Sequence, residues 1–533
     1  MQFVTFVKRA LFGRALFVSG LLANWLIGLV SIGSGQQQGM IQFEIRDDRG
    51  AFVPCRIHLT NESGKPVFAD GLPKWNDHFV CTGNVEVETR PGRYKWQIEK
   101  GPEYERLSGA VEVKLDRDAQ VKAVIQRIAN FRRRGWFSGD LHVHRAPADM
   151  ELLLKAEDLD YAPVIEWWNQ RGGELKAVGD REIRLDDGRM YELRAGEDER
   201  EGGALLFVGL DKPLNIQTPN REYPSPLVFV EEARKRNDQV WIDIEKPFWW
   251  DVPTWIATGE MDSIGVANNH MCRSSMLENE AWGRPRDSSR LASPLGNGYW
   301  TQEIYYHLLE SGIRLPPSAG SASGVLPNPV GYNRVYVKID ADADSESNYG
   351  FERDEWFAAL KKGRCFVTNG PLLEATSNNS YPGAVFRLPE TEKLSISLKL
   401  SLTSNDPKHW IELIHNGQVV KRVESSREGA ESMKMSLQIN QPGWFLVRAI
   451  AQVDHTFRFA STAPWYIEGA NGEKRLGRKS CQFFLRWIDE RISRVQANVR
   501  DPAQLRSVLE PHEKARLFWL DRIEKSNSGT EQE

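Results

Sequence analysis

The ten residues from Gly135 to His144 read GWFSGDLHVH, and they place two histidines at the end of an expected β-strand. His142 and His144 are two positions apart, so on extended backbone both imidazoles point to one face, and Asp140 is in phase with them. Imidazole is the commonest protein ligand for zinc, iron and similar ions. The stretch therefore predicts a metal-ligand strand over residues 140–144.

Strands and helices alternate downstream of this stretch. Strand candidates follow at 161–166, 203–209, 239–244, 263–267 and 334–338, and helix candidates lie at 149–158, 226–236, 301–311 and 354–362. Alternating strand–helix units favour an α/β layer or barrel. In barrel enzymes the carboxyl ends of the strands face the active site, and the two histidines fall at such an end.

Two stretches rich in short strands flank this region, at 40–130 and 380–482. Both alternate apolar and polar residues between Gly- and Pro-containing turns, which is typical of β-sandwich domains. The second stretch is expected to be of immunoglobulin type. Asn416-Gly417 within it is a strong hairpin signal.

The two ends of the chain carry different signals. Residues 1–35 combine a positive start, an apolar run and small residues, as in a secretory signal peptide, and an uncleaved anchor fits the same pattern. The protein is therefore expected to be exported, either periplasmic or secreted, or tethered by this segment alone. Residues 483–525 are expected to form a helical tail interrupted near Pro502 and Pro511.

Composition narrows the classes of partner and site. The net charge of −4 gives no reason to expect nucleic acid or an anionic membrane as a partner. The five cysteines contain no C-x-x-C pair, which excludes a Cys-rich zinc site and a disulfide scaffold. Cys55 and Cys81 share the first β-rich stretch, and the pattern leaves open whether they pair or remain buried thiols.

The GWFSGDLHVH stretch resembles the opening of the PHP (polymerase and histidinol phosphatase) superfamily, and is most similar to its carbaryl-hydrolase-like (CehA/McbA) branch. Residues 360–371, LKKGRCFVTNGP, resemble that branch too, and the likeness covers about residues 131–375. The resemblance implies a distorted seven-stranded βα barrel with a two- or three-metal site. It also implies hydrolysis of phosphate esters or, in this branch, carbamate esters.

The chain departs from the family pattern at several ligand positions. A Thr-Asp-His run and a Gly-Ser-Asp-x-His run are replaced by residues 165–169 and 320–324, a His-Pro pair by Lys246-Pro247, and a further histidine by Ala204. The family's glutamate is matched by Glu197. A two- or three-metal phosphatase site is therefore not expected.

New ligand candidates stand at predicted strand ends, namely Glu166, Glu245 and His270. Together with His142, His144 and Glu197 they offer nitrogen and oxygen ligands for one divalent ion such as zinc, manganese or iron. The alternative is structural, with ion-paired carboxylates and a hydrogen-bonded histidine.

A bound ion would imply hydrolysis of an ester, amide or carbamate by an activated water. Asp198 or Glu166 could accept the proton, and Lys246 or Arg273 could stabilise the oxyanion.

Aromatic pairs follow two of the presumed strand ends, Trp167-Trp168 and Trp249-Trp250. Such residues predict an apolar or sugar-stacking pocket for a small molecule or saccharide, although packing over the barrel mouth explains them too. The long stretch 271–300 directly follows His270 and is expected to be a lid. A second hypothesis is therefore a catalytically inactive barrel that binds glycans or wall polymer.

Overall fold

The protein is a mixed α/β structure with several β-sheets, as predicted. The computed structural model describes residues 38–528 except 116, 170–179, 341–349, 391–392 and 427–428. The predicted signal or anchor at 1–35 lies outside the described residues. Within the described part of the chain, no helix combines the length and apolar character needed to cross a membrane.

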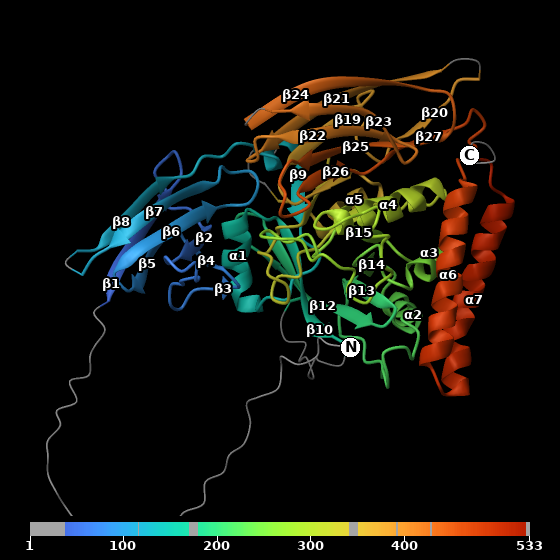
Figure 1. Cartoon of the computed structure of the whole chain (residues 1–533), viewed down its shortest axis with the longest axis horizontal. Helices are drawn as coiled ribbons and strands as arrows, with labels where there is room; N and C mark the ends of the chain where they lie inside the picture. Colours follow the sequence, from blue (N-terminus) through green and yellow to red (C-terminus); the bar gives the residue numbers. More distant parts are fainter. Residues whose placement is uncertain are drawn as a thin grey trace, which may run out of the picture. The chain divides into compact units, whose positions relative to one another are not determined.

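Two sheets share one apolar core in the first β-rich stretch (Figure 1). Their strand orders are β5-β1-β8 and β3-β4-β2-β6-β7. The strands are β1 (Gly39–Arg46), β2 (Cys55–Thr60), β3 (Lys74–Trp75), β4 (His78–Cys81), β5 (Asn84–Thr89), β6 (Gly92–Glu99), β7 (Leu107–Val113) and β8 (Ala119–Val124). Alternation places Ile41, Phe43 and Ile45 of β1 in the core, where each is fully buried.

The central region alternates strands with helices. Its strands are β9 (Trp136–Gly139), β10 (Tyr161–Trp168), β11 (Glu182–Arg184), β12 (Met190–Arg200), β13 (Gly203–Val208), β14 (Trp241–Ile244), β15 (Ser263–Ala267), β16 (Pro317–Ala319), β17 (Arg334–Lys338) and β18 (Cys365–Thr368). Its helices are α1 (Met150–Glu157), α2 (Leu227–Arg236), α3 (Val252–Thr258), α4 (Gly296–Glu310) and α5 (Arg353–Lys361), with 3-10 turns at Arg132–Arg134 and Pro147–Asp149. The predicted strands and helices of this region are present to within a few residues, apart from the strand placed at 140–144.

Pairing within the central sheet follows the order β16-β15-β14-β13-β12-β10-β9-β17-β18, an open path rather than a closed barrel. β10 with β12, β14 with β15 and β15 with β16 are parallel, whereas β12 with β13 and β13 with β14 are antiparallel. The eleven-residue strand β12 was not predicted from the sequence.

The expected strand at 140–144 begins earlier than predicted, since β9 ends at Gly139. Beyond Gly139 the chain stays extended, and Val143 forms parallel bridges with Val164 on one side and Ser323 on the other. His144 N donates to Ser323 O at 2.7 Å. Segment 141–144 therefore lies between the end of β10 and the stretch that follows β16.

The C-terminal β-rich stretch continues the central sheet. Its strands are β19 (Leu372–Ser377), β20 (Val385–Arg387), β21 (Leu394–Ser404), β22 (His409–His415), β23 (Gln418–Ser425), β24 (Gly429–Ile439), β25 (Gly443–Ala451), β26 (Phe459–Thr462) and β27 (Trp465–Glu468). β26 pairs with β18, and a separate β19-β21-β24 sheet shares a core with β22 and β25. The predicted hairpin is present between β22 and β23, with positive φ at both Asn416 and Gly417.

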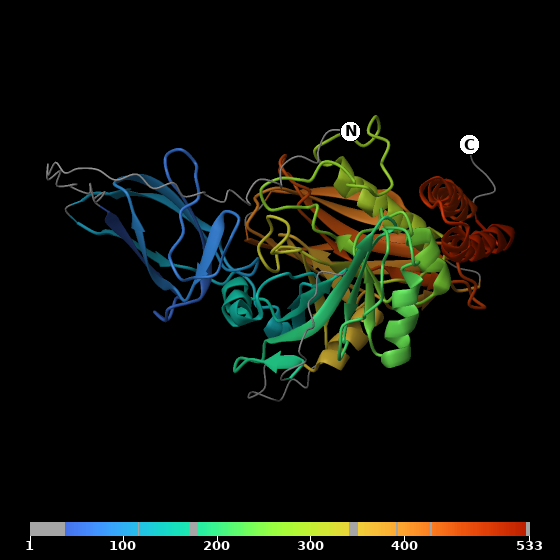
Figure 2. The ribbon, with the colours of Figure 1, turned by 90° about the horizontal axis from the view of Figure 1, so that it is seen from below.

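The tail consists of helices α6 (Arg478–Asn498) and α7 (Pro502–Glu524), which lie side by side (Figure 2). Pro502 opens α7, where a missing N–H costs nothing. The predicted interruption at Pro511 is wrong, because α7 continues through it. Val508, Ala515 and Trp519 are buried, so packing of α7 outweighs the lost hydrogen bond.

Arg56 on β2 joins the first β-rich stretch to the central region. Its guanidinium is 3% exposed and pairs with Glu157 of α1 and Glu99 of β6. Removing one partner of a buried ion pair leaves an uncompensated charge away from water.

Replacing Arg56 by methionine should lower the free energy of unfolding by about 3–5 kcal/mol, because Glu157 and Glu99 lose their cation. Urea unfolding of the purified chain measures this loss. The matched control is Arg290→Met, which removes a surface pair with Glu303 and should cost less than about 1 kcal/mol. Equal stability losses in the two variants would contradict the assignment.

Candidate metal centre

His142 and His144 present their ring nitrogens to one point. The segment that carries them is extended, so Leu141 and Val143 point the other way and are fully buried. Asp140 does not join the histidines. Its carboxylate accepts from the backbone N–H groups of His142, Ser321 and Gly331, which fixes the start of the segment.

Three ligand atoms converge here. The Nε2 atoms of His142 and His144 are 2.9 Å apart, and they lie 3.3 and 3.2 Å from Oε2 of Glu197. Ligand atoms that share an ion at about 2.0–2.2 Å must lie roughly 3.0–3.5 Å from one another. The triangle formed by these three atoms therefore fits a shared divalent cation.

Glu197 reaches this point from β12, and alternation brings Glu199 to the same face. Carboxylate oxygens of Glu197, Glu199 and Glu245 lie within 4.8 Å of one another. Glu199 is oriented by Trp168, whose Nε1 donates to its Oε2 at 3.0 Å. Sequence reasoning missed Glu199, although its i+2 spacing from Glu197 repeats that of the two histidines.

Asp198 points to the opposite face of β12, so its predicted role as the proton acceptor in this site is wrong. Both of its carboxylate oxygens accept from the guanidinium of Arg200, at 2.6 and 2.7 Å. The side chain is fully buried and does not line the cavity of the candidate site.

Glu245 lies behind His142 rather than beside the shared point. Its Oε1 is 3.3 Å from His142 Nδ1 and accepts from Lys246 Nζ at 2.5 Å and Asn269 Nδ2 at 2.6 Å. Its Oε2 accepts from Trp249 Nε1 at 2.9 Å. The contact with Nδ1 is an ion-pair distance without hydrogen-bond geometry, and it places Glu245 on the side of the ring from which a carboxylate can orient a ligating imidazole.

The cluster opens into a cavity of about 490 Å³. Eight residues expected in the site line it, namely His142, His144, Trp168, Glu197, Glu245, Lys246, Trp249 and His270. The cavity thus combines charged groups with apolar walls, as small-molecule sites do.

His270 lines the cavity but stands apart from the tight ligand group. Among the described residues it belongs to none of the groups whose ligand atoms lie within 4.8 Å of one another. Its Nδ1 is 2.9 Å from the carbonyl of Asn279, which only accepts, so Nδ1 carries the proton. Burial and the charge of Lys246 lower the pKa of His270 to about 3, and the ring is neutral near pH 7.

Glu166 is outside the cavity lining, contrary to the prediction that it is a ligand. β10 has a bulge opposite β12 between Ile165 and Trp167, and Glu166 is the extra residue. Its Oε2 accepts from the backbone N–H of Arg194 at 2.7 Å.

Two of the four predicted tryptophans are elsewhere. Trp167 points into the core, stacked on Phe207 and Phe229. Trp250 lies outside the cavity, and its Nε1 donates to the carbonyl of Trp282 at 2.8 Å.

Arg273 does not face the cavity either, so its predicted role in stabilising an oxyanion is wrong. Its guanidinium donates to Glu99 and Gln97 of β6. Two strong acceptors on the first β-rich stretch hold this side chain away from the site.

The stretch 271–300, predicted to be a lid, does form part of the cavity wall through Met276, Leu277 and Trp282. Trp282 stacks on Trp249, with ring centroids 5.0 Å apart. The wall is tied to the loop between β25 and β26 as well, since Met276 N donates to His455 O at 3.0 Å.

The ionisable groups of the cluster shift one another's pKa values. Burial lowers the pKa of His142, but Glu197 and Glu245 outweigh burial and raise it to about 10. Burial raises the pKa of Glu197, yet His142 and His144 lower it to about 2. Burial and the neighbouring carboxylates raise the pKa of Glu199 to about 7. The raised pKa of His142 thus favours its positively charged form beside the two carboxylates.

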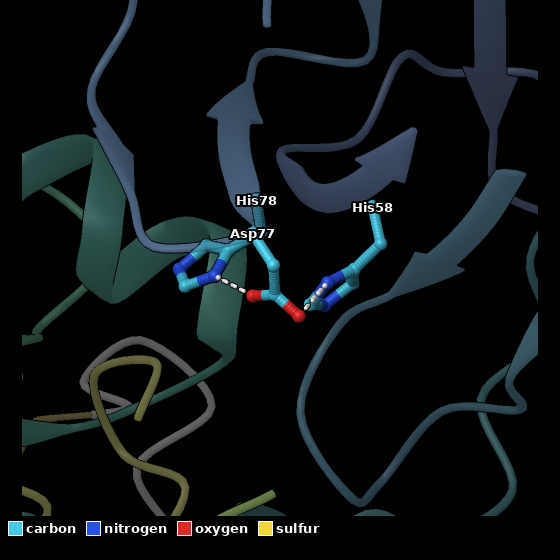
Figure 3. A group of neighbouring side chains, drawn as sticks. All are labelled: His58, Asp77 and His78. Carbon is cyan, nitrogen blue, oxygen red and sulfur yellow. Dashed lines mark hydrogen bonds and ion pairs between the residues drawn. The ribbon is translucent and has the colours of Figure 1, made fainter. Parts of the chain in front are cut away.

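A second group of candidate ligands, His58, Asp77 and His78, lies in the first β-rich stretch (Figure 3). Nδ1 of His58 and Nδ1 of His78 lie 3.2 and 3.1 Å from the Asp77 carboxylate. Arg56 Nε donates to His58 Nε2 at 3.0 Å, so His58 carries its proton on Nδ1, facing Asp77. In this tautomer the His58 Nδ1 that faces Asp77 carries a proton rather than a lone pair. Its contact with Asp77 is an ion-pair distance, whereas His78 Nδ1 is hydrogen-bonded to the same carboxylate.

Comparisons with known proteins add little to this geometry. No family model matches the chain. No curated protein matches it. Among solved structures, the chain is similar to the CARDB domain of a Pyrococcus furiosus protein. The solution structure of that domain is 13% identical with a TM-score of 0.14, covering 18% of this chain and 94% of that one. Its crystal structure in complex with di-metal ions is 12% identical with a TM-score of 0.13, covering 19% and 90%.

A broader similarity is to the apo structure of Bacteroides uniformis β-glucuronidase 3. It is 10% identical with a TM-score of 0.14, covering 81% of this chain and 63% of that one. Similarities with such low TM-scores carry no argument about fold or activity.

Protein purified after expression with zinc, manganese and iron should contain about one ion per chain, because His142, His144 and Glu197 form one ligand triangle. Elemental analysis should show this ion lost in the His142→Ala/His144→Ala variant. The matched control Glu166→Gln removes a carboxylate outside the cavity and should retain the ion. Equal metal content in the double variant and the wild type would contradict the assignment.

Replacing Glu245 by glutamine should weaken metal affinity by about 10–100-fold without abolishing it, because Glu245 orients His142 rather than ligating. Competition with a coloured chelator measures the change. Complete loss of metal in a folded Glu245→Gln protein would make Glu245 a ligand, and unchanged affinity would remove it from the site altogether.

Proposed function

We propose that this chain is a metal-dependent hydrolase that cleaves an ester, amide or carbamate bond. The observation that carries the proposal is the triangle of His142 Nε2, His144 Nε2 and Glu197 Oε2, with sides of 2.9, 3.2 and 3.3 Å. It opens into the cavity of about 490 Å³. Ion-paired carboxylates and hydrogen-bonded histidines with a purely structural role would not require a cavity beside them.

One divalent ion, zinc, manganese or iron, fits these three ligands. His142, His144 and Glu197 would hold such an ion, which would lower the pKa of a bound water molecule. The residues around the triangle are suited to the remaining tasks of hydrolysis.

Glu199 takes the role of proton acceptor that the sequence suggested for Asp198 or Glu166. It faces the cavity, whereas Asp198 and Glu166 do not. Trp168 Nε1 donates to its Oε2, and the Asn169 side chain bonds both backbone groups of Glu199. These contacts hold the carboxylate in one orientation toward the cavity.

Lys246 provides positive charge in the cavity. Its ammonium is 3% exposed and lies between Glu245 and the ring of Trp249, 4.5 Å from the ring centroid. A fixed cation in a site shielded from water stabilises charge that develops on a carbonyl oxygen.

The walls favour a small substrate with an apolar or aromatic part. Met276, Leu277, Val325 and Leu326 line the cavity together with Trp168. The second hypothesis, a glycan-binding protein without catalysis, needs exposed aromatic faces. Trp249 is fully buried and Trp167 and Trp250 are 2% and 6% exposed, which weighs against such a stacking platform.

The finer fold and the location are part of the same proposal. β9, β10 and β12 to β16 number seven strands in an open order. The isolated bridges from Val143 to Val164 and to Ser323 connect β10 with the stretch after β16, and these bridges support a distorted, incompletely closed PHP-type barrel. Residues 1–35 support export.

Metal-loaded protein should hydrolyse members of a panel of aryl esters, anilides and aryl N-methylcarbamates, followed by release of the coloured phenol or aniline. The His142→Ala/His144→Ala variant should be inactive. Glu199→Gln should lower kcat by about 10²–10⁴-fold while retaining the ion, because it removes a proton acceptor. Glu166→Gln, as control, should keep full activity. A metal-loaded protein that cleaves none of the panel, or a double variant as active as the wild type, would overturn the proposal.

A further inference from the structure

We propose that Cys55 and Cys81 form a disulfide between β2 and β4 when the chain folds in an oxidising environment. The two residues are directly opposite each other in the antiparallel β2–β4 pair. Their Sγ atoms are 3.9 Å apart and both side chains are fully buried. The inference is independent of the proposed hydrolase activity.

The typical Cα spacing of opposed strand residues lies in the range that a disulfide spans. Opposed residues of an antiparallel pair have Cα atoms about 4.5–5.5 Å apart. Disulfides span Cα separations of about 4.4–6.8 Å. Closing the remaining gap to a bond of about 2.05 Å takes rotation of the two side chains and a small approach of the two strands, because a disulfide needs Cβ atoms about 3.5–4.5 Å apart and opposed strand residues have them about 4.5–5.5 Å apart.

The other cysteines have different surroundings. Cys272 Sγ donates to the carbonyl of Asn269 at 3.2 Å, and Cys365 Sγ to that of Pro317 at 3.8 Å. All five cysteines lie in the described part of the chain, and within it only Cys55 and Cys81 bring two sulfur atoms together.

The bond would form by thiol–disulfide exchange with a small-molecule or protein disulfide as oxidant. The Cys81 thiolate attacks the oxidant, one S–S bond breaks, and a mixed disulfide and one free thiol result. The Cys55 thiolate then attacks Cys81 Sγ and expels the second thiol. Two cysteine thiols are oxidised, the oxidant disulfide is reduced to two thiols, and the two protons pass to those thiols. The hydrogen bond with Cys55 lowers the pKa of Cys81, which supports this order.

The cross-link would secure a weakly held strand. β4 has four residues, and its neighbour on the side away from β2 is the two-residue β3. β2 and β4 both contact α1 of the central region. A bond that joins positions 26 residues apart also restricts the unfolded chain, which stabilises the folded one.

The test refolds the full chain in a buffer of oxidised and reduced glutathione, and also incubates the native protein in that buffer. Remaining thiols are alkylated in denaturant, and a non-reducing digest is examined by mass spectrometry. We expect a Cys55–Cys81 linked peptide and three alkylated cysteines, that is, the five in the sequence minus the two in the bond. Reduction before alkylation should restore all five.

Single variants sharpen the result. Cys55→Ser and Cys81→Ser should each leave their four remaining cysteines free, whereas Cys272→Ser should keep the linked peptide. Oxidised wild type should also unfold at a higher urea concentration than reduced wild type, a comparison that needs no variant. Five alkylated cysteines after both treatments, or a bond from Cys55 or Cys81 to another cysteine, would overturn the proposal.

Discussion

Extended backbone turns successive side chains to opposite faces, and this constraint decides the composition of the candidate site. His142 and His144 face the cavity while Val143 is in the core. On β12 the same alternation places Glu197 and Glu199 in the cavity wall, whereas Asp198 points to the other face and accepts hydrogen bonds from Arg200. The bulge in β10 is the local exception, since it removes Glu166 from the alternation and leaves Trp168 on the cavity side.

Charge compensation is the second organising requirement. The buried carboxylates of Glu197 and Glu245 must be paired, because an isolated charge in the interior is costly. Lys246 pairs with Glu245, and the two carboxylates raise the pKa of His142, which favours its positively charged form beside them. The three ligand atoms of His142, His144 and Glu197 also lie at distances that fit a divalent cation, which would compensate the same carboxylates if it were bound.

The flanking β-rich stretches contribute to the cavity through its wall. Arg273 is held by Glu99 and Gln97 of β6, and Met276 by the backbone of His455. Both contacts lie in the stretch that directly follows His270. The stretch 271–300 is therefore held on one side by β6 and on the other by the segment around His455. These contacts explain why such a long loop has a defined position.

The sequence by itself determined the order of most strands and helices, the turn at Asn416-Gly417, and the placement of His142 and His144 on one face of an extended segment. These follow from local periodicity and turn chemistry, which neighbouring residues specify. It did not show β12, because most of its side chains are polar or charged and mask the strand pattern. Which carboxylates meet the histidines was decided by the tertiary structure alone. Alternation along β12 places Glu199 in the cavity wall and turns Asp198 to the opposite face. A bulge in β10 places Glu166 outside the cavity, and hydrogen bonds to Glu99 hold Arg273 away from it. These placements depend on strand pairing and on contacts with other segments of the chain. The residues next to each position do not specify them.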